Sequence, residues 1–196
     1  MSAVAGALVA AATIASHRAT GDPLELQHGV SLSQPRPMPE FALLDQHARP
    51  LTRAALDGRW TLLFAGFTHC PDICPTTLTK LAALAERLEN EGRDLQVMFL
   101  SLDPARDDPA TLAPYLDHFN PRFIGATGDS AEIDRLMAAA GLAYIKVPTG
   151  AETYTVDHST ALVLIDPRAR VAAYFRPPLR PEALAEDLLP VLAGTR

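Results

Sequence analysis

The sequence predicts a single α/β domain in which a mixed β-sheet lies between layers of helices. Two observations support this prediction. Continuous apolar runs of strand length at 60–67 and 94–102 are separated by an amphipathic helical pattern, as expected for strands covered on both faces. From Thr160 onward, two further strand-like runs and a final helix close the chain. No internal repeat is visible, so a layered fold is expected rather than a solenoid.

The composition is typical of a globular protein. Of the 196 residues, 48% are hydrophobic and 20% are charged, and a chain of this length fits one domain with a tail. The formal net charge is −6 at pH 7, and no cluster of Lys and Arg interrupts the acidic balance. The sequence therefore argues against a nucleic-acid partner.

Three segments are predicted along the chain. Residues 1–18 contain an apolar run that is shorter than the roughly 20 residues needed to cross a bilayer, and no basic residue precedes it. We expect a targeting or anchor segment whose start is missing or mis-assigned, and such a segment favours export of the protein. The alternative is a free N-terminal helix. Residues 19–37 are rich in proline and are expected to form a linker, and 38–196 form the folded domain.

Local patterns predict the remaining elements. Residues 41–44 and 51–52 flank a polar turn and predict an added N-terminal hairpin. Apolar residues recur at spacings of three and four from Leu78 to Leu88 and predict a helix that ends at Gly92. Further helices are expected at 109–119, 130–140 and 181–192, and further strands at 122–126, 144–147, 154–156, 160–165 and 171–175.

The only two cysteines, Cys70 and Cys74, lie between the strand at 60–67 and the helix that follows it. Pro75 is acceptable in the first turn of a helix, so we expect Cys74 at or just inside the helix start. A strand, a cysteine pair, a helix and a second strand, in that order, is the plan of the thioredoxin-like fold. Because a helix N-terminus carries partial positive charge, we expect these thiols to ionise more easily than a free cysteine.

Two thiols four residues apart suit a redox pair, a metal pair or two buried small hydrophobic residues better than a disulfide framework. Soft sulfur ligands select Cu(I) and Zn, and a C-x-x-x-C spacing suits a metal held between the sulfurs. A third ligand is then expected among the histidines, and His158 is the candidate. In a thioredoxin-like sheet, the segment entering the strand at 160–165 lies beside the cysteine loop. The alternative is a histidine whose nitrogens bond a loop carbonyl.

Four separated motifs extend this interpretation. They are G-F-T-H-C-P-D-I-C-P-T-T-L at 66–78, S-L-D-P-A-R-D-D-P at 101–109, P-R-F-I-G-A-T-G at 121–128 and V-D-H-S at 156–159. Together, and in this order, they resemble the Sco/SenC family of membrane-tethered, thioredoxin-like copper proteins. The match runs from Met38 to the C-terminus and covers the whole predicted domain.

The resemblance implies that Cys70, Cys74 and His158 bind one copper ion, as Cu(I) or Cu(II). It also implies delivery of copper to the dinuclear copper centre in subunit II of cytochrome c oxidase, or preparation of the cysteines of that centre. The expected partners are subunit II or another copper-receiving protein, a copper donor protein and a thiol reductant. Asp103 is similar to a family aspartate near the copper loop and is expected beside the site rather than on the metal; the alternative is a strand-end aspartate that caps a turn.

The resemblance also implies a location in the bacterial periplasm, with the N-terminal segment anchored to the inner membrane. Asp157, next to His158, is expected to orient the imidazole ring, because histidines that bind metals usually donate their second N–H to an acceptor.

Two functions remain open at this point, so the chain is not assigned as an enzyme. A copper metallochaperone requires both thiols and His158, whereas a thiol-disulfide oxidoreductase acting on the oxidase cysteines requires Cys70 and Cys74 alone. The same pair, once oxidised to a disulfide, does not bind copper. A peroxiredoxin-like peroxidase is disfavoured because the P-x-x-x-T/S-x-x-C setting of its reactive cysteine is missing.

Overall fold

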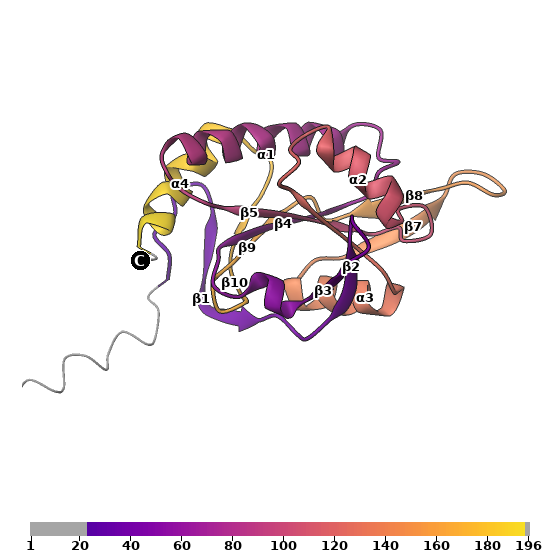
Figure 1. Ribbon diagram of the computed structural model, residues 1–196, viewed down its shortest axis with the longest axis horizontal. Coiled ribbons are helices and arrows are strands. Elements are labelled where there is room, and N and C mark those ends of the chain that lie inside the picture. Colours follow the sequence, from indigo (N-terminus) through magenta and orange to yellow (C-terminus); the bar gives the residue numbers. More distant parts are fainter. Residues whose placement is uncertain (1–22, 195–196) are drawn as a thin grey trace, which may run out of the picture.

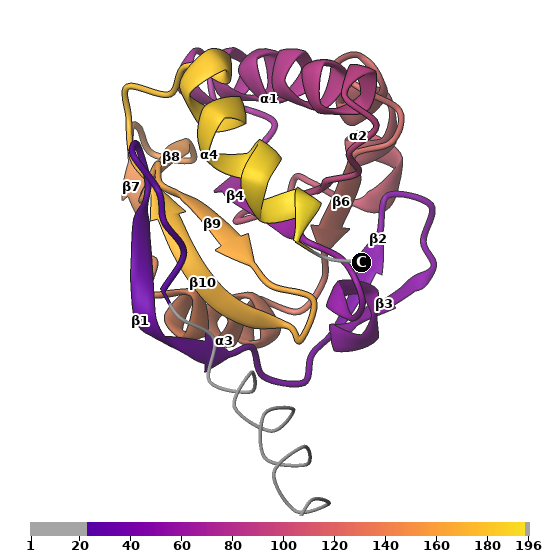
Figure 2. The ribbon, with the colours of Figure 1, turned by 90° about the vertical axis from the view of Figure 1, so that its left-hand side faces the viewer.

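The computed structural model describes residues 23–194, which form one layered domain (Figure 1). A central sheet has the strand order β1-β10-β9-β4-β5-β6-β2-β3. Helices α1 and α4 lie on one face of this sheet and α3 lies on the other (Figures 1 and 2). The three-layer α/β fold with a central mixed sheet, predicted from the sequence, is confirmed.

The centre of the sheet is formed by three parallel strands, β4 (Thr61–Gly66), β5 (Gln96–Ser101) and β6 (Ile124–Thr127). Every residue of β4 and β5 is buried. Strands covered on both faces have no solvent side on which polar residues would alternate, which explains their continuous apolar runs.

On the other side of β4, strand β9 (Leu162–Ile165) pairs antiparallel, and β10 (Arg170–Phe175) pairs antiparallel with β9. Leu63 of β4 lies opposite Val163 of β9. Because the two strands run in opposite directions, the end of β4 and the start of β9 meet at the same edge of the sheet. This register brings the loop after β4 close to the segment before β9.

Strand β1 (Val30–Pro37) shows that the linker prediction for 19–37 is wrong over its second half. This strand pairs antiparallel with β10 at the edge of the sheet, so it belongs to the folded domain. Its prolines suggested a linker. An edge strand tolerates proline, however, because one side of its backbone needs no ladder hydrogen bond, and the pairing shifts register between Ser31 and Arg36.

The chain before β1 is also attached to the domain. The backbone N–H groups of Gln27, His28 and Gly29 donate to the buried carboxylate of Asp187 at 2.7, 2.8 and 2.8 Å. The predicted anchor segment at 1–18 lies outside the described residues. Of the helices within 23–194, none combines the length and the apolar character that a membrane span requires.

The predicted N-terminal hairpin is present, and the strands predicted at 144–147 and 154–156 pair as a second hairpin. Strands β2 (Ala42–Asp45) and β3 (Pro50–Thr52) form the added N-terminal hairpin, which extends the sheet beyond β6. Strands β7 (Tyr144–Pro148) and β8 (Tyr154–His158) form a separate two-stranded sheet, which projects from the body of the domain (Figure 1). His158 is the last residue of β8.

The helices begin and end within two residues of the predicted positions. Leu78, Leu81 and Leu88 on α1 are completely buried, as their spacing predicts. Gly141 ends α3 in the left-handed conformation, with φ of 69°, which favours glycine. The helices are α1 (Ile73–Asn90), α2 (Pro109–Asp117), α3 (Ser130–Ala140) and α4 (Pro181–Ala193), and a 3₁₀ turn spans Arg53–Leu56.

Candidate metal centre

The two cysteines lie where the loop after β4 enters α1. Cys74 is the second residue of α1 and is completely buried, whereas Cys70 lies on the loop and is partly exposed. Both are free thiols. The backbone N–H of Cys74 donates to Sγ of Cys70 at 3.3 Å, so the loop folds back on the helix start. The predicted position of Cys74, just inside the helix start, is confirmed.

Gly66, the last residue of β4, leaves space for the buried thiol. A Cβ at this position would lie 2.8 Å from Sγ of Cys74 and 2.9 Å from the ring of Phe99. Both distances are too short for a carbon atom, so any larger residue at 66 displaces the sulfur or the ring. No sequence pattern reveals this requirement, because it depends on contacts between separate elements.

His158 reaches the cysteine loop from the end of β8. Its Nε2 lies 3.7 Å from Sγ of Cys74, and its Nδ1 lies 3.0 Å from the carbonyl oxygen of Ser159. A carbonyl oxygen only accepts hydrogen bonds, so we assign the ring proton to Nδ1. In the neutral ring, Nε2 then directs its lone pair toward the thiol.

Aromatic rings cover one side of the His158 imidazole, and a backbone carbonyl, not Asp157, orients it. The rings of Phe64 and Phe67 pack edge-on against the imidazole, with centroid distances of 6.3 and 6.2 Å. The expected role of Asp157 in orienting the ring is wrong, because Asp157 is exposed and the Ser159 carbonyl oxygen accepts the hydrogen bond from Nδ1. A backbone acceptor in the next residue leaves no trace in a sequence pattern.

The structure thus brings Cys74 and His158 into contact, and it places Cys70 against the backbone of Cys74. Within residues 23–194, no three His, Cys, Asp or Glu side chains are already grouped tightly enough to hold a metal ion. The chemistry of the donors nevertheless fits a soft ion such as Cu(I), because thiols and imidazole are its preferred ligands. Sγ of Cys70 would have to turn away from the Cys74 N–H to join them.

Burial raises the pKa of the Cys74 thiol, and the hydrogen bond with the Cys70 thiol raises it further. The expectation that this thiol ionises easily is therefore wrong for Cys74. The helix N-terminus favours the thiolate, but the loss of solvation at a fully buried sulfur is the larger effect. A metal ion that displaces the thiol proton must therefore stabilise the Cys74 thiolate in place of the lost solvation.

Asp103 lies in the turn after β5, and its carboxylate is completely buried. The hydroxyl of Tyr154 donates to it at 2.7 Å, Nζ of Lys146 donates at 3.3 Å, and Nε of Arg106 also donates. Burial alone would raise the pKa of Asp103, but these hydrogen bonds outweigh burial and hold it below its usual value. Asp103 thus ties the end of β5 to the hairpin that carries His158.

Asp107 is a buried residue whose importance the sequence analysis missed. Its carboxylate accepts hydrogen bonds from the backbone N–H of Thr68 at 3.0 Å, from Oγ1 of Thr68 at 2.5 Å and from Oγ of Ser101 at 2.7 Å. Thr68 lies two residues before Cys70, so Asp107 fixes the cysteine loop. The motif at 101–109 contains three aspartates, and the sequence does not show which of them are buried.

Tyr115 on α2 was also missed. Its hydroxyl is buried and has no hydrogen-bond partner among the described residues. Burial raises the pKa of Tyr115, and charge on the thiols of Cys74 and Cys70 would raise it further.

The comparisons with known proteins agree with this geometry. Residues 31–193 match the family model described as SCO1/SenC. The chain belongs to the SCO1/SenC family. A relative from Stutzerimonas stutzeri is 39% identical over 166 residues, which is 84% of this chain and 81% of the relative.

Two further SCO1/SenC comparisons differ in their coverage. The chain is 38% identical over 136 residues to Protein SCO1 homolog 1, mitochondrial, from Arabidopsis thaliana, covering 69% of this chain but 41% of that protein. The structure of Bradyrhizobium japonicum ScoI with copper bound is 36% identical, with a TM-score of 0.72, over 79% of this chain and 98% of that chain. The predicted family and its thioredoxin-like fold are confirmed.

Proposed function

We propose that this chain is a copper-binding metallochaperone that binds one copper ion, as Cu(I) or Cu(II), through Cys70, Cys74 and His158. One observation carries the proposal: Sγ of Cys74 lies 3.7 Å from Nε2 of His158, although 84 residues separate them in the sequence. The copper in the B. japonicum relative supports the choice of metal. The cargo goes to the dinuclear copper centre of cytochrome c oxidase subunit II, or the chain prepares the thiols of that centre.

Two changes convert this arrangement into a three-coordinate site. Copper binding would release the Cys74 proton to solvent, and the thiolate–copper bond would replace the solvation that burial removed. Cys70 turns from the Cys74 N–H toward the same ion. Release proceeds by ligand exchange, in which a thiolate or imidazole of the receiving protein replaces one ligand at a time, so that copper is never without ligands.

The proposal extends to the location and the partners. Residues 1–18 would anchor the protein to the inner membrane of a bacterium, and the domain that begins with β1 would lie in the periplasm. Its partners there are a copper donor, the oxidase subunit and a thiol reductant. Fractionation of cells that produce the complete protein tests this location: recovery in the cytoplasmic fraction would contradict it.

The second candidate function is a thiol-disulfide oxidoreductase that acts on the oxidase cysteines without transferring copper. A specific observation favours it: both cysteines are free thiols, and the backbone N–H of Cys74 donates to Sγ of Cys70 at 3.3 Å, which holds the two residues together. Disulfide exchange by this pair makes no use of His158.

A Cu(I) titration against a competing chelator separates the two functions. In the reduced protein, Cys74→Ser and His158→Ala should each lower copper affinity by roughly a hundredfold or more, because loss of even an outer-shell partner costs about 10–100-fold. His47→Ala is the matched control, since His47 is exposed on the β2–β3 turn and should bind copper normally.

Disulfide exchange with a peptide carrying the two oxidase cysteines is measured on the same variants. If His158→Ala binds copper as tightly as the unmodified protein and exchanges disulfides at the same rate, the metallochaperone proposal is wrong and the oxidoreductase remains. If exchange is lost only in Cys74→Ser while copper binding is lost in both, the metallochaperone proposal stands.

A further inference from the structure

A groove beside His158 brings together two arginines and no acidic residue. It encloses about 670 Å³, and its walls come from β1, the end of α3, the segment after β8 and the end of β10. Arg36 and Arg176 supply the charge, and Leu142, Ala161 and Pro177 supply apolar surface. A basic groove is unexpected on a chain whose net charge is −6.

Arg36 is held in a fixed position on one wall. Its Nη2 donates to the hydroxyl of Tyr174, and that hydroxyl donates to the carbonyl oxygen of Ala140 at 2.8 Å. A Cβ on Gly141 would lie 2.8 Å from both Nη2 of Arg36 and the Tyr174 hydroxyl, so the glycine keeps this space open. A guanidinium that is already ordered loses less entropy when it binds a partner.

Arg176 follows β10 and supplies the second charge. It is exposed, and among the described residues it has no hydrogen-bond or ion-pair partner. An arginine presents five N–H donors in a planar fork that matches the two oxygens of a carboxylate. These donors are therefore available to a molecule outside this part of the chain.

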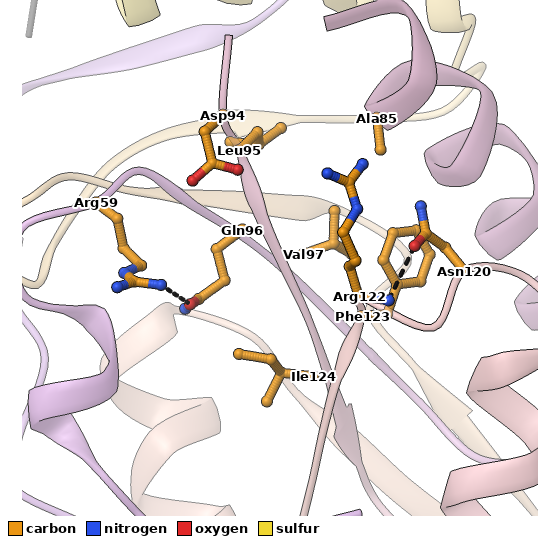
Figure 3. A pocket seen from close by; sticks show the side chains of 10 residues that line it. All are labelled: Arg59, Ala85, Asp94, Leu95, Gln96, Val97, Asn120, Arg122, Phe123 and Ile124. Carbon is orange, nitrogen blue, oxygen red and sulfur yellow. Dashed lines mark hydrogen bonds between the residues drawn. The ribbon is translucent and has the colours of Figure 1, made fainter. Parts of the chain in front are cut away.

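A second cavity with two arginines shows why the groove is distinctive (Figure 3). There Arg122 is paired with both oxygens of Glu89 at 2.9 and 2.6 Å, and Arg59 donates to Oε1 of Gln96 at 3.4 Å. The carboxylate of Asp94 also lines that cavity. In that cavity an ion pair compensates the charge of Arg122 and a carboxylate lines the wall, whereas the groove beside His158 has, within residues 23–194, neither an ion pair nor a carboxylate in its lining.

The groove is connected to the candidate metal centre through Ser159, which lines it. The carbonyl oxygen of Ser159 accepts the Nδ1 proton of His158 at 3.0 Å. The Ser159 backbone N–H donates to the carbonyl oxygen of Ala143 at 2.9 Å, so this wall is rigidly attached to the start of β7. A protein segment bound in the groove would lie beside a proposed copper ligand.

We propose that this groove is the docking site for a carboxylate-bearing segment of the protein with which the chain exchanges copper. The inference rests on the proposed function, which it deepens by naming the chemistry of the partner. An acidic partner is repelled by most of a chain with net charge −6 and is attracted at the groove. This difference in charge between the groove and the rest of the surface orients the partner. The partner then approaches beside the site where copper ligands are exchanged.

The test uses fluorescence anisotropy with a labelled peptide of alternating Asp and Gly residues, added to the reduced, metal-free full chain. Arg176→Glu should weaken binding roughly tenfold, because reversing one charge turns an attraction into a repulsion. Arg87→Glu is the matched control: Arg87 is exposed on α1, has no partner among the described residues, and its reversal changes the net charge equally. This control should lose less than about twofold in affinity, since distant exposed charges are screened.

Amide chemical shifts locate the peptide. Shifts concentrated at Gly141, Ser159 and Thr160 support the proposal, and shifts elsewhere overturn it. Equal weakening by Arg176→Glu and Arg87→Glu would show only a net-charge effect. If inorganic phosphate binds as tightly as the peptide and displaces it, the groove is a small-anion site and the docking proposal is also wrong.

Cys74→Ser keeps this test separate from the proposed function. The variant should bind the acidic peptide normally while it loses copper. If the unmodified chain binds the peptide but no copper, the metallochaperone proposal fails and the groove remains a docking surface. If the unmodified chain binds copper but not the peptide, the docking site alone is contradicted.

Discussion

Asp103 and Asp107 lie on the same turn after β5 and are both completely buried, but their carboxylates are stabilised in different ways. Asp103 is surrounded by the cations of Arg106 and Lys146 and by the hydroxyl of Tyr154. The carboxylate of Asp107 instead accepts hydrogen bonds from neutral donors on Thr68 and Ser101.

The difference shows how one turn organises both parts of the candidate centre. Through Tyr154 and Lys146, Asp103 anchors the hairpin that ends in His158. Through Thr68, Asp107 anchors the loop that carries the cysteines. The backbone of Asp107 adds rigidity, because its N–H donates to the Asp103 carbonyl at 2.9 Å and its own carbonyl accepts from Thr127 at 2.7 Å.

The largest effect is expected for Asp107→Ala. The substitution removes three hydrogen bonds and leaves buried donors unsatisfied, so the free energy of unfolding should fall by about 4 kcal/mol. Urea denaturation measures this change. Asp108→Ala is the control, because this neighbouring aspartate is exposed and only caps α2, where it accepts from the Thr111 N–H at 2.8 Å. Equal losses in the two variants would contradict the anchoring role of Asp107.

A smaller effect is expected for Asp103→Asn, of about 2 kcal/mol at neutral pH, because the amide keeps part of the hydrogen bonding. The loss should depend on pH. Since the folded-state pKa of Asp103 lies below its usual value, its ionisation stabilises the fold above the unfolded-state pKa of about 3.9. This contribution disappears as the pH falls through the folded-state pKa.

The stability difference between the unmodified protein and Asp103→Asn should therefore shrink in acid. Denaturation midpoints recorded from neutral pH down to the acid limb measure that difference directly. Other carboxylates, such as Asp45, titrate in the same range but are common to both proteins and cancel. A difference that stays constant with pH would show that the charge of Asp103 is not what anchors the hairpin.

The smallest effect, and one of opposite sign, is expected for Tyr115→Phe. Neither anchoring aspartate bonds the Tyr115 hydroxyl, which has no partner among the described residues, so its removal should stabilise the fold by about 0.5–1 kcal/mol. Thermal unfolding of the reduced protein measures the gain. A large loss of copper affinity in this variant would instead mean that the hydroxyl supports a charged thiol, which would add a third element to the centre.

The sequence predicted the elements well because local patterns determine them. Continuous apolar runs identified β4 and β5, and the spacing of Leu78, Leu81 and Leu88 identified α1. Proline misled the analysis at β1, because the same residue suits a linker and an edge strand, and only pairing with β10 distinguishes them. The order of the motifs was enough to indicate the family.

The side-chain environment of the centre was not predictable in the same way. The position of Cys74 next to a helix start suggested a reactive thiol. The thiol is instead buried by packing against β4 and β5, and this burial raises its pKa. Asp107 and Asp157 carry the same side chain in the same kind of motif. One is completely buried and the other is exposed, and no local pattern separates them.

By itself, the sequence determined the helices, the strands other than β1, the candidate ligands for a soft metal and the family, because each depends on residue type and short-range spacing. Tertiary structure alone decided that Nε2 of His158 meets Cys74, that Asp107 fixes the cysteine loop, and that Arg36 and Arg176 share a groove. The physical reason is common to all three. Strand pairing brings distant segments together, and the solvation and charge of a side chain depend on those neighbours rather than on its place in the chain.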